Sequence, residues 1–154
     1  MDTMLKQEWF EQYWPDPNRE SDKLYVWYRE RDLKPAVKLK AGDRVLVYEV
    51  GRHRIKGWTG AKKLFASGIL TDKIFPITPQ ERSDHGDEWK SKRLIDVKYR
   101  VEPIHGLPLD SVLKILGYKK KPRRRFRLNS EKFDSLEAAL RQIWQALQPP
   151  QSQS

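Results

Sequence analysis

One tryptophan lies in the most basic and glycine-rich part of the sequence. Trp58 directly follows Gly57, and the stretch around it carries five cations: Arg52, Arg54, Lys56, Lys62 and Lys63. Guanidinium and ammonium groups bind phosphates, whereas an indole ring stacks on a flat group such as a base. A tryptophan that served packing alone would be expected on a regular strand or helix. This combination of residues therefore predicts a binding loop.

A second group of cations lies near the C-terminus. Residues 119–127 carry seven positive charges in nine positions, and six of them are candidate phosphate contacts: Lys119, Lys120, Lys121, Arg123, Arg124 and Arg125. Such a run is either a solvated turn or a phosphate-contacting loop. Phe126 would anchor one end of it to the core, which favours the phosphate-contacting interpretation. Each phosphate neutralised in this way would make affinity fall with salt.

The six tryptophans separate into two groups. Trp9 and Trp144 lie on apolar stripes and are expected in the core. The others lie in loops or at the ends of expected elements, and together with one tyrosine they are the candidates for a base-binding pocket: Trp14, Trp27, Tyr48, Trp58 and Trp89. The alternative is that several of these rings simply fill the interior of the fold.

Composition narrows the classes of partner. The chain has 154 residues and a formal net charge of +10, which favours anionic partners and nucleic acid above all. It has no cysteine, and its histidines (His53, His85 and His105) are far apart in the sequence, so we expect no metal site and no cofactor. No apolar run is long enough to span a membrane and no signal-peptide pattern is present, so the expected location is cytoplasmic.

Support for catalysis in the sequence is weak. Asp96 and Lys98 are spaced like the acid-x-lysine end of a metal-dependent nuclease site, and the partner carboxylate would have to come from Asp84, Asp87 or Glu88. The two residues belong to a strand face on which every position is charged, as is usual for a solvent-facing side. No surroundings typical of a catalytic triad are present. We therefore predict no catalytic residues.

The expected strands surround the Gly42–Asp43 turn. Residues 44–50 have apolar side chains on both faces, which predicts a strand covered on two sides. Residues 92–102 alternate most regularly, with Ile95, Val97, Tyr99 and Val101 on one face. Further strands are expected over residues 23–29, 63–71 and around 126–128.

Helices are expected near both ends of the chain. Leu5, Trp9 and Tyr13 recur every fourth position, which predicts a helix over residues 3–14. A second helix should begin at Leu109 and stop at Gly117, and a third should start with Asp134 as its cap. One further helical turn is expected between residues 29 and 40, a polar loop over residues 75–90, and a disordered tail over residues 149–154. The result is a single α+β domain over residues 1–148, a small barrel of about five to six strands with flanking helices.

The order of these motifs resembles the PUA-like superfamily, and within it the EVE domain more than its YTH and ASCH relatives. The resemblance rests on the Gly42–Asp43 turn with the strand RVLVYEV, the basic turn into Gly57, the loop ending in Trp89 and the strand LIDVKYRV, and it covers residues 23–147. The opening of the chain differs from the usual EVE pattern. The resemblance implies an aromatic cage that binds a base, often a modified one, with Trp89 and the segment from Gly57 as the best-matching positions.

Three functions remain open at this point. The leading one is a nucleic-acid-binding module, a monomer or weak dimer without a membrane partner, which holds a flipped or single-stranded base of DNA or RNA. The second is a small ribonuclease of the ASCH type. The third is a protein-interaction domain whose charge gives only solubility.

Overall fold

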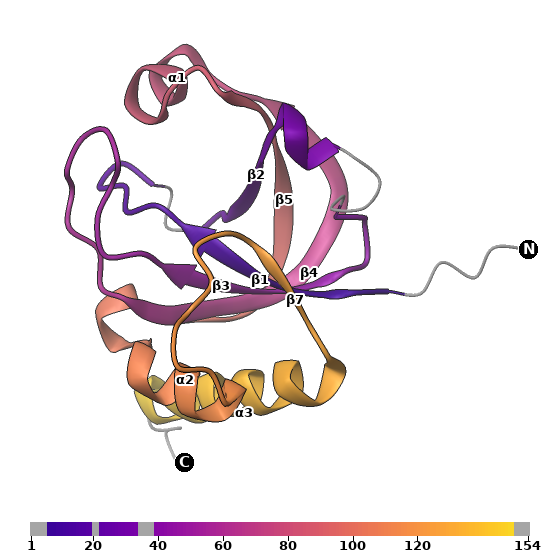
Figure 1. Ribbon diagram of the computed structural model, residues 1–154, viewed down its shortest axis with the longest axis vertical. Helices are drawn as coiled ribbons and strands as arrows, with labels where there is room; N and C mark the ends of the chain where they lie inside the picture. Colours follow the sequence, from indigo (N-terminus) through magenta and orange to yellow (C-terminus); the bar gives the residue numbers. More distant parts are fainter. Residues whose placement is uncertain (1–5, 20–21, 34–38, 150–154) are drawn as a thin grey trace, which may run out of the picture.

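The computed structural model describes residues 6–19, 22–33 and 39–149, and within them the chain forms one curled sheet with helices at its two ends (Figure 1). The sheet follows the order β2-β5-β4-β3-β1-β7, and β6 pairs with β4. Its strands are β1 (Glu8–Tyr13), β2 (Tyr25–Arg29), β3 (Arg44–Glu49), β4 (Lys63–Pro76), β5 (Trp89–Arg100), β6 (Leu107–Pro108) and β7 (Phe126–Leu128). The helices are α1 (Pro79–His85), α2 (Leu109–Leu116) and α3 (Ser130–Leu147), with short 3-10 helices at Glu30–Leu33 and Pro103–His105.

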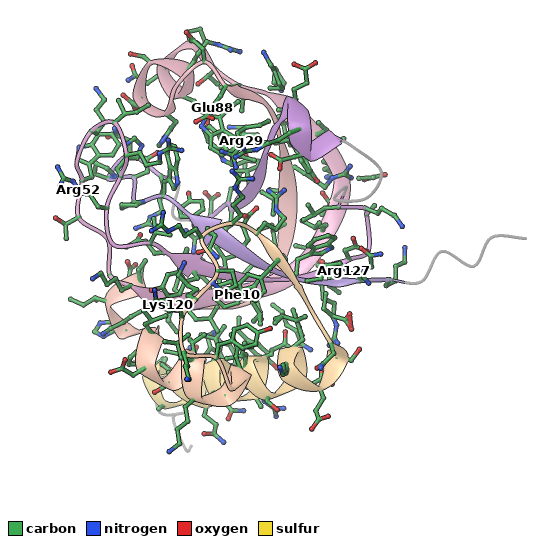
Figure 2. All side chains as sticks on the ribbon, viewed as in Figure 1. Phe10, Arg29, Arg52, Glu88, Lys120 and Arg127 are labelled. Carbon is green, nitrogen blue, oxygen red and sulfur yellow. The ribbon has the colours of Figure 1, made fainter. Side chains whose placement is uncertain are left out.

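The central strand β3 buries both of its faces, as its sequence predicts. Val45 and Val47 belong to a core cluster inside the curl of the sheet, while Leu46 and Tyr48 belong to a second cluster that includes residues of α2 and α3. Figure 2 shows Phe10 on the side covered by these helices. The alternation of β5 is also confirmed, because Ile95 and Val101 are buried whereas Asp96 on the other face is exposed.

The helix expected over residues 3–14 is wrong, because residues 8–13 form strand β1. This strand pairs in parallel with β3 and antiparallel with β7. Trp9 and Tyr13 are four positions apart. Because alternate residues of a strand share a face, this spacing places the two rings on one face of a strand as readily as on one face of a helix. Phe10 is buried on the opposite face, and a strand covered on both sides has no clear alternation.

Three further differences concern where elements begin and end. The expected polar loop over residues 75–90 contains α1, which begins with a reciprocal capping box between Thr78 and Glu81. Strand β4 runs to Pro76 instead of stopping near Thr71. Helix α3 starts earlier than expected, since Asn129 rather than Asp134 caps it. The α+β class, helix α2 and the closing strand β7 are confirmed.

The sheet does not close into a barrel, because β2 and β7 are its two edges. Arg125, just before β7, bridges the opening instead. Its guanidinium donates to Glu11 Oε2 at 2.6 Å on β1 and to the carbonyl oxygen of Trp27 at 2.8 Å on β2. It also lies 3.4 Å from Asp32 Oδ1. Burial has the largest single effect on the pKa of Arg125 and lowers it, but the charge and hydrogen bond of Glu11, together with the charge of Asp32, outweigh burial and raise that pKa.

The basic loop between β3 and β4 is a tight hairpin. Arg52 and Thr59 form a bridge, and the backbone N–H of His53 donates to the carbonyl of Trp58 at 2.8 Å. A side chain at Gly60 would collide with the carbonyl of Val50, and Gly57 has a positive φ of 72°. Both positions therefore need glycine.

Some expectations fall on residues that lie outside the described part of the chain. They are the start of the expected first helix at residues 3–5, much of the segment between residues 29 and 40, and residues 150–154 of the expected tail. Of the segment between 29 and 40, residues 30–33 form a 3-10 helix. Among the described helices, none is both long and apolar enough to cross a membrane.

The Arg125 bridge leads to a prediction about stability. Replacing Arg125 with Met leaves the buried Glu11 carboxylate without its partner, and we expect the free energy of unfolding to fall by about 3–5 kcal/mol. Urea denaturation followed by circular dichroism measures this change. Arg124→Met is the matched control, since Arg124 is exposed and its loss should cost less than about 0.5 kcal/mol. An equal loss of free energy of unfolding in the two variants would show that the bridge stabilises the fold no more than an exposed arginine does.

Candidate functional site

A cavity of about 630 Å³ lies where the edges of the open sheet face each other. Strands β1 and β2, the end of α1 with the start of β5, the 51–60 hairpin and the arginine run before β7 all contribute to its lining. Figure 2 shows two of the lining residues, Arg29 and Glu88, between α1 and β2. The Arg125 bridge is part of the same wall, so the group that holds the sheet edges together also shapes the cavity.

Three tryptophans line this cavity and contact one another. Trp89 lies edge-to-face with Trp14, at 5.5 Å between ring centroids, and with Trp27, at 5.8 Å. Trp89 is fixed by a hydrogen bond from its indole N–H to the carbonyl of His85 at 2.9 Å. Trp58 does not line the cavity, but its ring centroid lies 4.9 Å from that of His53 and 6.3 Å from that of His85. Four of the five predicted pocket residues are thus brought together, from segments far apart in the sequence.

A pair of histidines forms the base of this aromatic cluster. His53 Nε2 lies 2.7 Å from His85 Nδ1, and His85 Nε2 lies 2.9 Å from Asp16 Oδ2. The other nitrogen of His53, Nδ1, accepts from the backbone N–H groups of Ile55 (3.2 Å) and Lys56 (2.9 Å). The expectation that the histidines lie far apart is therefore wrong for this pair, although no group that could hold a metal ion occurs among the residues described.

The contacts of the pair define where its protons lie. Because His53 Nδ1 accepts two N–H bonds, the proton of neutral His53 must be on Nε2, and it is donated to His85 Nδ1. His85 then carries its own proton on Nε2 and donates it to Asp16. Every ring nitrogen is used inside the protein, so neither histidine offers a free lone pair to a bound molecule. The network positions the surrounding rings and does not provide a general base.

The network also sets two protonation equilibria. His53 is fully buried, and burial, followed by the proximity of His85, lowers its pKa. Burial raises the pKa of Asp16, but hydrogen bonds from His85 and from the backbone of Asn18 outweigh this and lower it overall. At neutral pH, His53 is therefore neutral and Asp16 is ionised.

Arginines surround the opening of the cavity. Arg29 lies over the Trp89 ring at 4.9 Å and within 3.5 Å of Glu88, and Arg54 lies over the Trp14 ring at 5.6 Å. Arg31 and Arg124 complete this rim, together with Arg123. Desolvation, followed by the positive charges of Arg29 and Arg124, lowers the pKa of Arg31. The rim is therefore a site of converging positive charge, where a bound anion would relieve repulsion.

Two cations of the C-terminal run have structural contacts instead of free ammonium or guanidinium groups. Arg125 forms the buried bridge to Glu11. Lys121 donates to Gln12 Oε1 at 2.7 Å and lies 5.1 Å from the centre of the Tyr48 ring, and burial lowers its pKa. Tyr48 itself is buried in the core cluster on the helix side and does not line the cavity.

The other predicted phosphate contacts do not line the cavity. In the 51–60 hairpin, Lys56 reaches Asp84 at 3.7 Å. Beyond the hairpin, Lys63 donates to the carbonyl of Ile104 at 2.6 Å. Lys119 and Lys120 are exposed on the loop between α2 and β7, as are Arg52 and Lys62 near the hairpin. Figure 2 shows Arg52 and Lys120 on two separate loops.

Several residues of the site were not predicted as such. In the sequence, 32 positions separate His53 from His85, and only their contact in the fold reveals the pair. Asp16 looked like part of a proline-containing break, and Arg29 and Arg31 looked like ordinary charges after a strand. The nuclease-like pair is not part of the site: Asp96 and Lys98 are exposed and do not line the cavity, and Lys98 lies 3.7 Å from Glu137.

The lowered pKa of His53 predicts how stability changes with pH. The unfolded chain takes up this proton near pH 6.5, whereas the folded chain does so only at lower pH. The free energy of unfolding should therefore be unaffected by this group well above pH 6.5 and should fall as the pH drops below about 6.5. Asp16 contributes only at lower pH, around and below its ordinary value of 3.8. Urea denaturation at successive pH values measures the slope.

Two variants assign this slope to one residue. His53→Asn keeps an oxygen that can accept the backbone N–H groups but cannot titrate, so the decline over this range should become shallower. His105→Asn removes an exposed histidine outside the cavity and should leave the decline as it is. An unchanged slope in His53→Asn would contradict the assignment.

Comparison with solved structures finds the same fold in the ASCH protein of Zymomonas mobilis. Its crystal structure has a TM-score of 0.54 and 15% sequence identity, covering 86% of this chain and 94% of that chain. A serine-to-alanine variant of the same protein gives a TM-score of 0.54 and 15% identity, covering 86% of this chain and 96% of that chain.

No protein-family model matches the sequence, and no curated protein matches it. The structural likeness concerns the fold, and the assignment to the EVE branch is not confirmed. The chain therefore shares the fold of the Zymomonas mobilis ASCH protein.

Proposed function

We propose that this protein binds single-stranded or locally unpaired nucleic acid by holding one base in the cavity and phosphates on the arginine rim. The proposal rests on one observation: three tryptophans and several arginines line the same cavity. Its volume of about 630 Å³ falls within the range of ordinary ligand pockets, roughly 300–1,000 Å³. The net charge of +10 would favour the approach of a polyanion.

The roles divide by chemistry. Tryptophan faces attract any base because every base has a π-face, at roughly 1–3 kcal/mol per stacked base. Arg123 and Arg124 are exposed at the rim, and Lys119 and Lys120 continue the same loop away from the cavity. A nucleic-acid backbone that follows this loop would place its phosphates on the cations while one base enters the cavity. Phosphate contacts would then position the strand, and the cavity would select the base.

Binding to RNA or to DNA, recognition of a modified base, and the ribonuclease alternative all remain predictions. Titration of the intrinsic tryptophan fluorescence with short single-stranded RNA and DNA, plain or methylated, tests the first two. Incubation of the same RNA with the purified protein tests cleavage. No observation in the described residues favours catalysis, because the histidines nearest the cavity have both ring nitrogens occupied.

The first prediction concerns the arginine rim. In the double variant Arg123→Gln/Arg124→Gln, binding should weaken about equally for all sequences. Its logarithmic salt slope should fall by about 2, since each lost phosphate contact removes about 1. The matched control is Lys114→Gln/Arg141→Gln, which removes the same charge from exposed positions on α2 and α3. If both double variants behave alike, only net charge matters and the rim has no special role.

The second prediction concerns stacking. Trp27→Ala should weaken binding about 10-fold or more, whereas Trp27→Phe keeps an aromatic face and should lose less. Fluorescence polarisation with a labelled oligonucleotide measures both, and circular dichroism verifies that each variant is folded. Equal affinity for the wild type and Trp27→Ala would exclude stacking on this ring.

A further inference from the structure

The hydrogen-bonding capacity that the cavity leaves unused consists mainly of donors. Within the described residues, the indole N–H groups of Trp14 and Trp27 have no acceptor. The guanidinium groups of Arg54, Arg123 and Arg124 line the same cavity and have no acidic partner in that part of the chain. Each guanidinium carries five N–H donors and no acceptor. A molecule that fills this cavity must therefore offer acceptors.

The acceptors of the cavity are largely used inside the protein. Glu11 receives Arg125 at 2.6 Å, and Asp16 receives His85 at 2.9 Å. Asp32 accepts the backbone N–H group three residues before it, at 2.7 Å. These carboxylates line the cavity, yet their oxygens already hold donors of the protein. They cannot serve as the main partners of an amino group on a ligand without giving up those bonds.

Two further lining residues bear on the balance of hydrogen-bond donors and acceptors in the cavity. Glu88 is at the rim with its side chain 42% exposed, and it lies 3.5 Å from the guanidinium of Arg29. Tyr13 is also among the lining residues, and burial raises its pKa to about 12, so that its hydroxyl keeps its proton. The excess of donors over free acceptors therefore remains.

Guanine, adenine and cytosine present different hydrogen-bond donors and acceptors to such a site. The N7 and O6 atoms of guanine form one edge made of acceptors alone, which a guanidinium fork meets with two parallel hydrogen bonds. The same edge of adenine carries an amino donor beside N7, and cytosine carries an amino donor at its N4 position. A donor-lined cavity repels both amino groups.

We propose that the cavity selects guanine and that Arg54 reads its O6 and N7 atoms, an inference that rests on the nucleic-acid-binding function proposed above. Arg54 is the suitable reader because its guanidinium lies over the Trp14 ring at 5.6 Å. The residue before it, His53, is fully buried and bonded at both ring nitrogens, which anchors the backbone from which Arg54 projects. Arg123 and Arg124 lie over no ring of the described residues, and they remain available for phosphates.

Base analogues test this preference directly. The probes are short adenosine RNA oligonucleotides with one central position occupied by adenosine, guanosine, inosine, 7-deazaguanosine or an abasic site. Guanosine should bind about 10-fold more tightly than adenosine. Inosine keeps O6 and N7 and lacks only the 2-amino group, so it should match guanosine. In 7-deazaguanosine a C–H group replaces N7, and affinity should fall to the level of adenosine.

A charge-conserving substitution identifies the reader. Arg54→Lys keeps the positive charge but loses the planar fork, so the preference for guanosine should fall about 10-fold while binding of the adenosine oligonucleotide changes little. Arg123→Lys is the matched control at the rim, and it should keep the full preference. Both substitutions leave the core untouched, because Arg54 and Arg123 are exposed.

The remaining outcomes separate this inference from the function on which it rests. Equal binding of the adenosine and guanosine probes, each tighter than the abasic probe, would overturn the selection of guanine and leave base binding in place. Weak binding of inosine with tight binding of 7-deazaguanosine would show recognition through the 2-amino group and overturn the role of O6 and N7. Equal binding of the abasic and base-containing probes, or no binding at all, would overturn both proposals.

Discussion

The contact between Arg125 and Glu11 is the interaction on which the arrangement of this protein depends most. It lies in the gap of an open sheet and joins β1 to the carbonyl of Trp27 on the far edge strand, β2. A buried charge pair is stable only when the partners meet in good geometry and their other hydrogen bonds are satisfied. The distance between the two sheet edges is therefore narrowly fixed, and with it the width of the cavity.

The positive charge of the chain divides into two kinds that composition does not distinguish. Some cations hold the structure together, as Arg125 and Lys121 do through buried contacts with β1. Others, such as Arg54 and Arg124, project from loops at the cavity without an acidic partner among the described residues. A run of like charges looks uniform in the sequence. In the fold, one member of the run, Arg125, is buried in a bridge to Glu11, whereas its neighbour Arg124 is exposed.

Local patterns predicted the elements that have one clear hydrophobic signal. Strand β5 alternates strictly, and helix α2 has regular spacing and stops at Gly117, so both were predicted from few residues. Strand β1 was not, because Trp9 and Tyr13 share a face in a strand as well as in a helix. The candidate pocket residues named from the sequence include Trp14, Trp27 and Trp89, which line the cavity, and also Trp58 and Tyr48, which do not. The His53–His85 pair was not predicted, since contact between residues 32 positions apart depends on the whole fold.

The parallel pairing of β1 with β3, and its antiparallel pairing with β7, has a kinetic consequence. The first strand of the chain needs partners from the middle and from the last third, so its contacts are highly non-local. Domains with many such contacts fold in about milliseconds to seconds, because loop-closure entropy is lost before the contacts form. During synthesis on the ribosome, β1 can pair with β3 early, but its other edge stays without its partner until β7 has emerged. The wall of the cavity is thus among the last parts of the native structure to assemble.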